Sequence, residues 1–560
     1  MTMKLNPQTL WIVALTFSLI GANALWGETS PPISSSGTDF MAPKRDVHGK
    51  SIGQEDVLIE EVAFTDSGGR RYRRLDVGIS GTLEGWVVKE GPRGNHFTAH
   101  PEFALTQSGN DYRRFHGILR YEASKGTAVT LVYPEAGTLW NQKLFVTVHG
   151  RSGSFFGGTL KAWNKNLDPA DPLGDLTGYE RVMLDKGYAV AKTRRNAGAA
   201  SGDPGSGPGD YAVVLDDGEI VQGRNLNIHT GLLLDMVRLS ENLLKDRLGE
   251  KPLRTYWFGH SAGAMNARVI NYVSGLNLDE NGETIIDGFI NSDSGGGRYL
   301  PVLMEEGQDT LLLTDGARRQ FVKTLETAHQ LYTARHDMPT LPPWMSRGYL
   351  LNKRLTAKIL RDKGLGNKMR IYEVQGVSHM AGGHRSGEGD TVLLDLSGLM
   401  DGLIDLLDNW VEKDIAPPPS KSGWLELGDV DGDGVNENEA IALPEVACPL
   451  GLYYPYPPSR GDSGGGYTGF VAFDGRGLEP LDGQGAFVDM NLNRYLDQRE
   501  SVDEAWHRLG LLKHGEVFSR SKYQACVEAT VARLRKEKLI TERVAQRYIQ
   551  QASKADFPGQ

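Results

Sequence analysis

Ser261 lies in a sequence pattern that is typical of a nucleophilic serine. The motif G-x-S-x-G occupies Gly259–Gly263 (GHSAG), between the apolar run Arg254–His260 and a helical pattern. Such a strand–turn–helix needs glycine on both sides of the serine, because the strand and the helix pass too close for side chains. The amide of Ala262 would then lie at a helix N-terminus, where it stabilises developing negative charge. The pattern predicts Ser261 as nucleophile and Ala262 as one oxyanion donor.

A second serine, Ser463, stands in a similar motif. Gly461–Gly465 (GDSGG) resembles the nucleophile motif of chymotrypsin-like proteases. That fold also needs two β-barrels and an upstream segment of the type Ala-Ala-His-Cys, and the sequence contains neither. The flanks are rich in Pro and Gly, which is typical of a flexible loop. We therefore expect Ser463 to play no catalytic part.

A serine nucleophile needs a base that accepts its proton near neutral pH, and histidine is the natural choice. His379 follows the strong apolar run Met369–Gly376 late in the chain. In folds that carry the G-x-S-x-G turn, the catalytic residues follow one another in the order serine, acid, histidine, so the base is expected late in the chain. His384 in the same segment is the second choice. His329 and His336 fall in a segment expected to form a cap. The sequence predicts His379 as the base.

The acid that orients the base has several candidates. Asp309 ends the apolar run Leu300–Asp309, which we expect to be the second strand after the nucleophile, so Asp309 is the first choice. Glu306 competes from the same run. Asp293 would serve if the acid follows the earlier strand, and Asp315 is less favoured.

A second oxyanion donor is expected after an earlier strand. His149 and Gly150 end the apolar run LFVTVHG, and the absence of a side chain at Gly150 lets the backbone come near the site. The N–H of Arg151, or that of Ser152, would then face the oxyanion. The alternative is that these glycines only make a turn.

Carboxylates at alternate positions suggest a calcium loop. Asp429, Asp431 and Asp433 precede a glycine, as at the start of an EF-hand loop, but position twelve of that loop is Ala440. An acidic turn is the alternative, and 489–500 repeats the spacing without the turn glycine. The sequence shows no zinc, phosphate-loop or dinucleotide motif. We expect catalysis without a cofactor and keep a structural calcium ion open.

Features near the N-terminus predict export. Lys4, the apolar run Leu10–Gly21 and the small residues of Ala22–Ala24 together resemble a signal peptide of residues 1–24. No apolar run reaches the roughly 18 residues of a membrane anchor. The net charge is −10 and the basic residues are scattered, so nucleic acid is not expected as a partner. In an oxidising compartment Cys448 and Cys526 either pair or remain separate thiols.

The remaining pattern predicts an α/β fold. Short apolar runs alternate with helical patterns, the clearest of which is 227–248, and this alternation indicates a mostly parallel sheet with flanking helices. These runs are 144–150, 188–194, 254–260, 285–291 and 369–376. The segment 202–223 is expected to be a loop with a hairpin, and two helices are expected at about 521–537 and 542–553.

We expect the following division of the 560 residues. After the signal peptide and a flexible tether at 25–54, an α/β-hydrolase domain covers 55–416, with a β-rich N-terminal segment at 55–143. A mostly helical cap is expected at about 310–366. After three consecutive prolines, 417–560 forms a C-terminal extension packed on the core.

Four segments carry a resemblance to a known family: GLNLDENGETIIDGFI, LPVLMEEGQD, MRIYEVQGVSHM and IALPEVACPLGLYY. Together with Ser261, they resemble the secreted bacterial "α/β hydrolase domain" proteins from about Phe115 to the C-terminus. The resemblance implies Ser261 as nucleophile, His379 as base and an acid near Asp309, although EEGQD stands where the family usually has a segment like SETD. It also implies that the C-terminal extension belongs to the hydrolase unit.

The sequence therefore predicts a secreted serine hydrolase that cleaves a small-molecule or polymer carboxylic ester through an acyl-enzyme. A peptidase or amidase on the same fold would use the same residues, and a non-catalytic, calcium-dependent surface-binding protein is the other alternative. The oligomeric state is left open.

Overall fold

A computed structural model describes the chain from residue 57 to residue 557 with gaps. The described residues are 57–66, 68–91, 94–98, 113–122, 129–135, 139–148, 172–174, 176–193, 211–223, 227–272, 277–279, 281–293, 321–329, 360–362, 364–377, 379, 394–421, 440–455, 468–473 and 501–557. All of them belong to one compact unit, 42–560.

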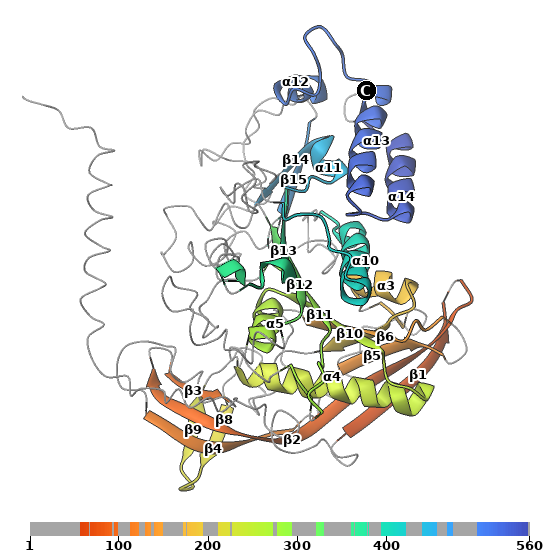
Figure 1. Ribbon diagram of the computed structural model, residues 1–560. Helices are drawn as coiled ribbons and strands as arrows, with labels where there is room; N and C mark the ends of the chain where they lie inside the picture. The colour runs from red at the N-terminus through yellow and green to blue at the C-terminus, as the bar shows by residue number, and fades with distance from the viewer. Residues whose placement is uncertain are drawn as a thin grey trace, which may run out of the picture. The chain divides into compact units, whose positions relative to one another are not determined.

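Among the described residues, thirteen strands form one sheet (Figure 1). Their bounds are β1 Val57–Thr65, β2 Arg71–Gly91, β3 Gly94–Thr98, β4 Arg113–Glu122, β5 Val129–Pro134, β6 Lys143–Val148, β7 Ala189–Thr193, β8 Tyr211–Leu215, β9 Ile220–Gly223, β10 Arg254–His260, β11 Gly288–Ser292, β12 Lys323–His329 and β13 Met369–Val374. A separate antiparallel pair is formed by β14 (Gly451–Pro455) and β15 (Thr468–Ala472).

Half of the large sheet is parallel, in the order β13-β12-β11-β10-β6-β7. The expected apolar runs form β6, β7, β10, β11 and β13, and the predicted parallel sheet is confirmed. The chain passes from β6 outward to β7 and then returns to β10 on the other side of β6. In α/β sheets ligands bind at the carboxyl ends of the strands beside such a reversal. Ser261 directly follows β10 at this point.

The other half of the sheet is antiparallel. The long strand β2 pairs with β1 and β5 along its first part and with β3 and β4 along its second part. β8 and β9 form a hairpin that joins this half through β4, as expected for 202–223. The β-rich N-terminal segment therefore extends the parallel half through the β5–β7 pair.

Helices cover both faces of the parallel half. Their bounds are α3 Gly178–Asp185, α4 Asn227–Leu248, α5 Ala262–Tyr272, α10 Ser397–Lys413, α11 Pro444–Ala447, α12 Val502–Arg508, α13 Arg520–Lys536 and α14 Glu542–Ser553, with a short 3₁₀ turn at Gly366–Lys368. Side chains of α4 and α5 share one apolar core, and those of α3 and α10–α14 share the other. None of the helices in the described ranges is both long enough and apolar enough to cross a membrane.

Alternation along β10 divides its side chains between these two cores. Trp257 lies in the core with α4 and α5, whereas Tyr256 and Phe258 lie in the core with α3 and α10. Successive side chains of a strand point to opposite faces, so a strand covered on both faces is apolar throughout. This is why three consecutive residues of β10, at 256–258 (YWF), are all large and aromatic.

The strand β12 corrects one expectation about the cap. The segment 310–366 was expected to be mostly helical, but its residues 323–329 form a strand of the parallel half, between β11 and β13. The sequence KTLETAH contains no apolar run, because buried polar side chains such as Thr324 and Glu326 replace apolar ones. Asn271 donates to Thr324, and Arg268 pairs with Glu326, so these groups are satisfied inside the protein.

The C-terminal helices pack against α10. Gly402 of α10 approaches the chain between α13 and α14 so closely that a Cβ there would lie 2.1 Å from the carbonyl oxygen of Leu539. A disulfide joins Cys448, at the end of α11, to Cys526 in α13. The disulfide therefore links two elements of the C-terminal extension, α11 and α13. The contact at Gly402 joins the extension to α10, the helix that follows β13.

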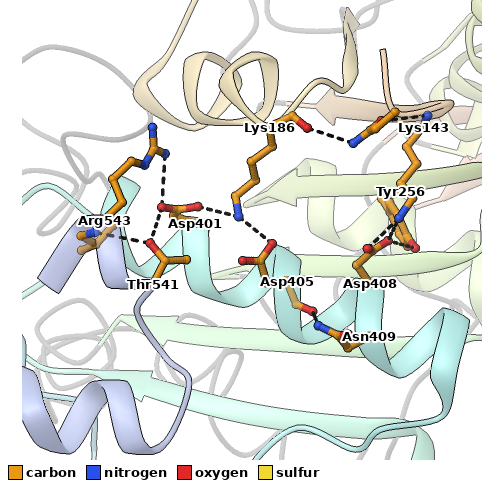
Figure 2. A network of polar contacts seen from close by, with 11 residues as sticks. Lys143, Lys186, Tyr256, Asp401, Asp405, Asp408, Asn409, Thr541 and Arg543 are labelled. Atoms are coloured by element: carbon orange, nitrogen blue, oxygen red, sulfur yellow. Dashed lines mark hydrogen bonds and ion pairs between the residues drawn. The ribbon is translucent and has the colours of Figure 1, made fainter. Parts of the chain in front are cut away.

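A network of charged groups also joins α10 to its neighbours (Figure 2). Lys186 pairs with Asp401 and Asp405 of α10 at 2.7 and 2.5 Å, and Asp401 also accepts hydrogen bonds from Thr541 and Arg543. Burial is the largest single influence and opposes the charged form of Asp401, yet Lys186, Thr541 and Arg543 together outweigh it and lower the pKa of Asp401. This network links the C-terminal helices to the turn that leads into β7.

One turn of α10 further on, Asp408 accepts from both Lys143 and Tyr256. The two oxygens of Asp408 lie 2.7 Å from Nζ of Lys143, and the Tyr256 hydroxyl donates at 2.6 Å (Figure 2). Lys143 begins β6 and Tyr256 lies in β10. The helix α10 therefore binds both β6 and β10, the two strands between which the order of strand addition reverses.

Two carboxyl groups lie at the opposite end of β10 from Ser261. Thr255 donates its hydroxyl to Glu241 at 2.7 Å and its backbone N–H to Asp287 at 2.8 Å. Burial raises the pKa of Glu241 to about 7 and that of Asp287 to about 6. Folding therefore shifts both groups toward their neutral forms relative to the unfolded chain.

A raised carboxyl pKa stabilises the fold at low pH and loses that contribution as the pH rises from the ordinary value through the raised one. We expect the melting temperature of the protein to fall between pH 5 and pH 8, and to fall less in Glu241→Gln, which keeps an acceptor for Thr255. Thermal unfolding followed by circular dichroism measures both. Asp246→Asn, on an exposed position of the same helix, is the control. Identical pH profiles for Glu241→Gln and the wild type would contradict this role of Glu241.

Candidate active site

Ser261 forms the whole turn between β10 and α5. Its φ of 55° lies in the left-handed region, which non-glycine residues adopt rarely. A Cβ at Gly259 would lie 2.5 Å from the backbone of Gly263, and one at Gly263 would lie 2.1 Å from the carbonyl oxygen of Val148. Both glycines of the motif are therefore required by the close approach of strand and helix, as the sequence predicts.

The turn is also held by the neighbouring strand. The N–H of Ser261 donates to the carbonyl oxygen of Ser292 at 2.9 Å. Ala262 is the first residue of α5, so its amide belongs to the positive end of the helix dipole. The contact between Gly263 and Val148 brings the end of β6 against the same turn. The amide of Ala262 thus lies at the N-terminus of α5, directly after Ser261.

A buried carboxylate lies at the corresponding point of the next strand. Asp293 directly follows β11, has a φ of 46° and no exposed surface, and its Oδ2 lies 2.5 Å from Nδ1 of His379. Its other oxygen accepts the N–H of His329 at 3.1 Å, and its own N–H donates to Thr327. The contacts with His379 and His329 hold the carboxylate, and the bond to Thr327 holds the backbone of Asp293.

The pairing of β10 with β11 places the strand end that precedes Asp293 next to the strand end that precedes Ser261. His260 and Ser292 are paired in register, so Ser261 and Asp293 occupy equivalent positions at the ends of two adjacent parallel strands. The rings of His260 and His379 are tilted against each other with centroids 4.5 Å apart. His379 therefore lies beside the residue that precedes Ser261, and the site combines a strained serine, an imidazole and a buried carboxylate.

The structure gives His379 a carboxylate other than the first choice from the sequence. Asp293 occupies that place, and it was one of the alternatives. The first choice rested on a strand at 300–309, but the strand that lies next to β11 is β12, and it ends at His329. The following predicted residues lie outside the described part of the chain, so those predictions stay as they were: Asp309, Glu306, Asp315, His384, His336, Arg151, Ser152, Ser463, Asp429, Asp431 and Asp433.

Several buried polar residues around the site carried no signal in the sequence. Arg268 of α5 forms an ion pair with Glu326 of β12 through contacts of 2.8 and 2.5 Å, and both side chains are buried. Asn291 of β11 donates to the same carboxylate at 3.4 Å. The pair fastens α5, the helix that follows Ser261, to β12, which is separated from β10 by one strand. A buried charge needs a partner of opposite charge. Neither partner of this ion pair can be recognised from its local sequence, apart from the polar character of KTLETAH in β12.

Comparison with known proteins identifies one family. The family model described as "Alpha/beta hydrolase domain" matches residues 229–550, which is more than half of the chain. No curated protein matches. The match begins in α4 and runs through α14, so it includes Ser261, Asp293, His379 and the C-terminal helices.

Solved structures show more distant likenesses. They include TT1662 from Thermus thermophilus (13% identity, TM-score 0.27, covering 52% of this chain and 98% of that one) and esterase B from Lactobacillus rhamnosis (13%, 0.25, 44% and 69%). A third is the poly(3-hydroxybutyrate) depolymerase LpqC from Bordetella parapertussis (12%, 0.28, 64% and 92%). At these identities and TM-scores they carry no information about the substrate of this chain.

The close contact at the turn can be tested by adding one methyl group. In Gly263→Ala the new Cβ would meet the Val148 carbonyl at 2.1 Å, and the backbone has to move. Overpacking of this kind costs about 1–3 kcal/mol, so we expect a lower melting temperature. Gly68→Ala is the control, since its Cβ would approach no atom closer than 3.2 Å. A stability of Gly263→Ala equal to that of the wild type would show that the turn is looser than described.

Proposed function

The chain belongs to the alpha/beta hydrolase domain family, and from this membership and the site we propose that it is a serine hydrolase that cleaves carboxylic esters. The observation that carries the proposal is the contact of 2.5 Å between Asp293 and His379, beside the strained turn of Ser261. The three residues follow one another in the order serine, acid, histidine, which is the order of this fold.

In the proposed reaction, the Nδ1–H of His379 donates to Asp293. This leaves Nε2 to accept the proton of the Ser261 hydroxyl as its oxygen attacks the ester carbonyl. The buried carboxylate holds the ring in this tautomer and stabilises the imidazolium that forms. His379 then returns the proton to the leaving alcohol, and a water molecule activated in the same way releases the acid from the acyl-enzyme.

The negative charge of the tetrahedral intermediate needs hydrogen-bond donors fixed in advance. The proposal assigns this role to the N–H of Ala262, at the start of α5. The second donor is expected from the chain after Val148, with Arg151 as the prediction from the sequence. None of these steps uses a cofactor.

Export is part of the proposal. The signal-peptide features of residues 1–24 support it, and so does the Cys448–Cys526 disulfide, because disulfides persist mainly in oxidising compartments. The substrate would then be an ester met outside the cytoplasm.

An alkyl phosphonate that mimics an acylating ester tests the nucleophile directly. We expect p-nitrophenyl ester hydrolysis by the wild type, stoichiometric loss of activity with the phosphonate, and the label on the peptide that contains Ser261. Ser261→Ala should lose both hydrolysis and labelling, whereas Ser463→Ala should keep both. Label on Ser463, or no label on a folded protein, would refute the proposal.

The identity of the acid is tested by a pair of matched substitutions. Asp293→Asn keeps the acceptor for the His329 amide but presents an NH₂ group to His379, which forces the wrong tautomer. We expect kcat to fall by roughly a thousandfold or more. Asp309→Asn should leave kcat unchanged. The reverse pattern, at melting temperatures equal to that of the wild type, would restore Asp309 as the acid.

A further inference from the structure

His329 contacts both members of the acid–base pair from the end of β12. Its backbone N–H donates to Oδ1 of Asp293 at 3.1 Å, and its ring Nδ1 lies 3.2 Å from the backbone carbonyl oxygen of His379. The side chain has no exposed surface. A single buried residue thus touches the acid with its main chain and the main chain of the base with its ring.

The distances show which group forms a hydrogen bond with Nδ1 of the His329 ring. Nδ1 of His329 is 3.9 Å from Oδ2 of Asp293, which is too long for a hydrogen bond, whereas the carbonyl of His379 is within range. A carbonyl oxygen only accepts, so Nδ1 of His329 carries the hydrogen. The ring of His329 therefore donates to the backbone of the base.

This assignment sets the direction of a chain of hydrogen bonds. In the neutral ring, Nε2 of His329 is an acceptor, and the hydroxyl of Ser292 donates to it at 3.3 Å. Oγ of Ser292 then accepts from Nδ1–H of His260, also at 3.3 Å. Two buried imidazoles and one hydroxyl thus have their proton positions set by the carbonyl of His379.

We propose that His329 is a positioning residue for the base, because it holds the backbone of His379 in place while Asp293 holds its ring. This inference rests on the proposed function, in which His379 is the base. If only Asp293 held the His379 ring, through Nδ1, the ring would still move whenever the His379 backbone moved. A displacement of 1 Å at a reacting group costs up to about a hundredfold in rate. The two contacts together fix the direction in which Nε2 of His379 points.

Two substitutions separate this role from simple packing. H329N places an amide donor near the position of Nδ1 and keeps the contact with the His379 carbonyl. H329Q places its amide near the position of Nε2 and loses that contact, although it fills more of the space. The pair therefore differs in the one hydrogen bond that the inference invokes.

We expect kcat for a p-nitrophenyl ester to fall about 10- to 100-fold in H329Q, with KM changed less than about twofold, and to stay within about threefold of the wild type in H329N. Rates are expressed per serine titrated by the phosphonate, so that misfolded chains do not count. A kcat of H329Q equal to the wild type, or equal losses in both variants, would overturn the inference. Packing alone predicts the smaller loss in H329Q.

A measurement on the wild type covers the case in which the variants do not fold. Protein labelled with ¹⁵N-histidine should show neutral buried imidazoles with the proton on Nδ1, and a spectrum without any such ring would overturn the inference. Failure of the proposed function looks different, because the wild type itself would then not be labelled at Ser261.

Discussion

The buried carboxylate of Asp293 is the constraint around which the carboxyl ends of the parallel strands are arranged. A carboxylate without exposed surface is costly unless hydrogen bonds satisfy it, and here the ring of His379 and the amide of His329 do so. Both partners must come from outside β11. This requires the registers Ser292 to Thr327 and His329 to Val374, since a slip of one residue would turn the carboxylate to the other face.

The turn of Ser261 depends on a second constraint, the close approach of backbone to backbone. Gly263 lies against the carbonyl of Val148, so β6, β10 and the first turn of α5 form one rigid corner. The ion pair between Arg268 and Glu326 fastens the same helix to β12. The left-handed conformation of Ser261 persists because the structure on both sides holds it.

Support for these strands comes from far along the chain. Asp408 of α10 binds Lys143 of β6 and Tyr256 of β10, and Asp401 joins the turn before β7 to the loop that begins α14 (Figure 2). The match to the hydrolase family runs through residue 550. The C-terminal helices and their disulfide thus contribute to the same unit as the site, although they lie after the last strand of the large sheet.

The sequence alone was enough to locate the turn of Ser261, most parallel strands, the helix α4 and the late histidine, because glycine spacing and apolar periodicity are local signals. Tertiary structure was needed to find the carboxylate that contacts His379 and to find the strand β12. In the sequence, Asp293 and Asp309 both follow an apolar run, so the local pattern does not distinguish them. Which carboxylate contacts His379 depends on the order and register of the strands. The polar residues of β12 hid it from a search for apolar runs, because their partners, Arg268 and Asn271, lie more than fifty residues away in sequence.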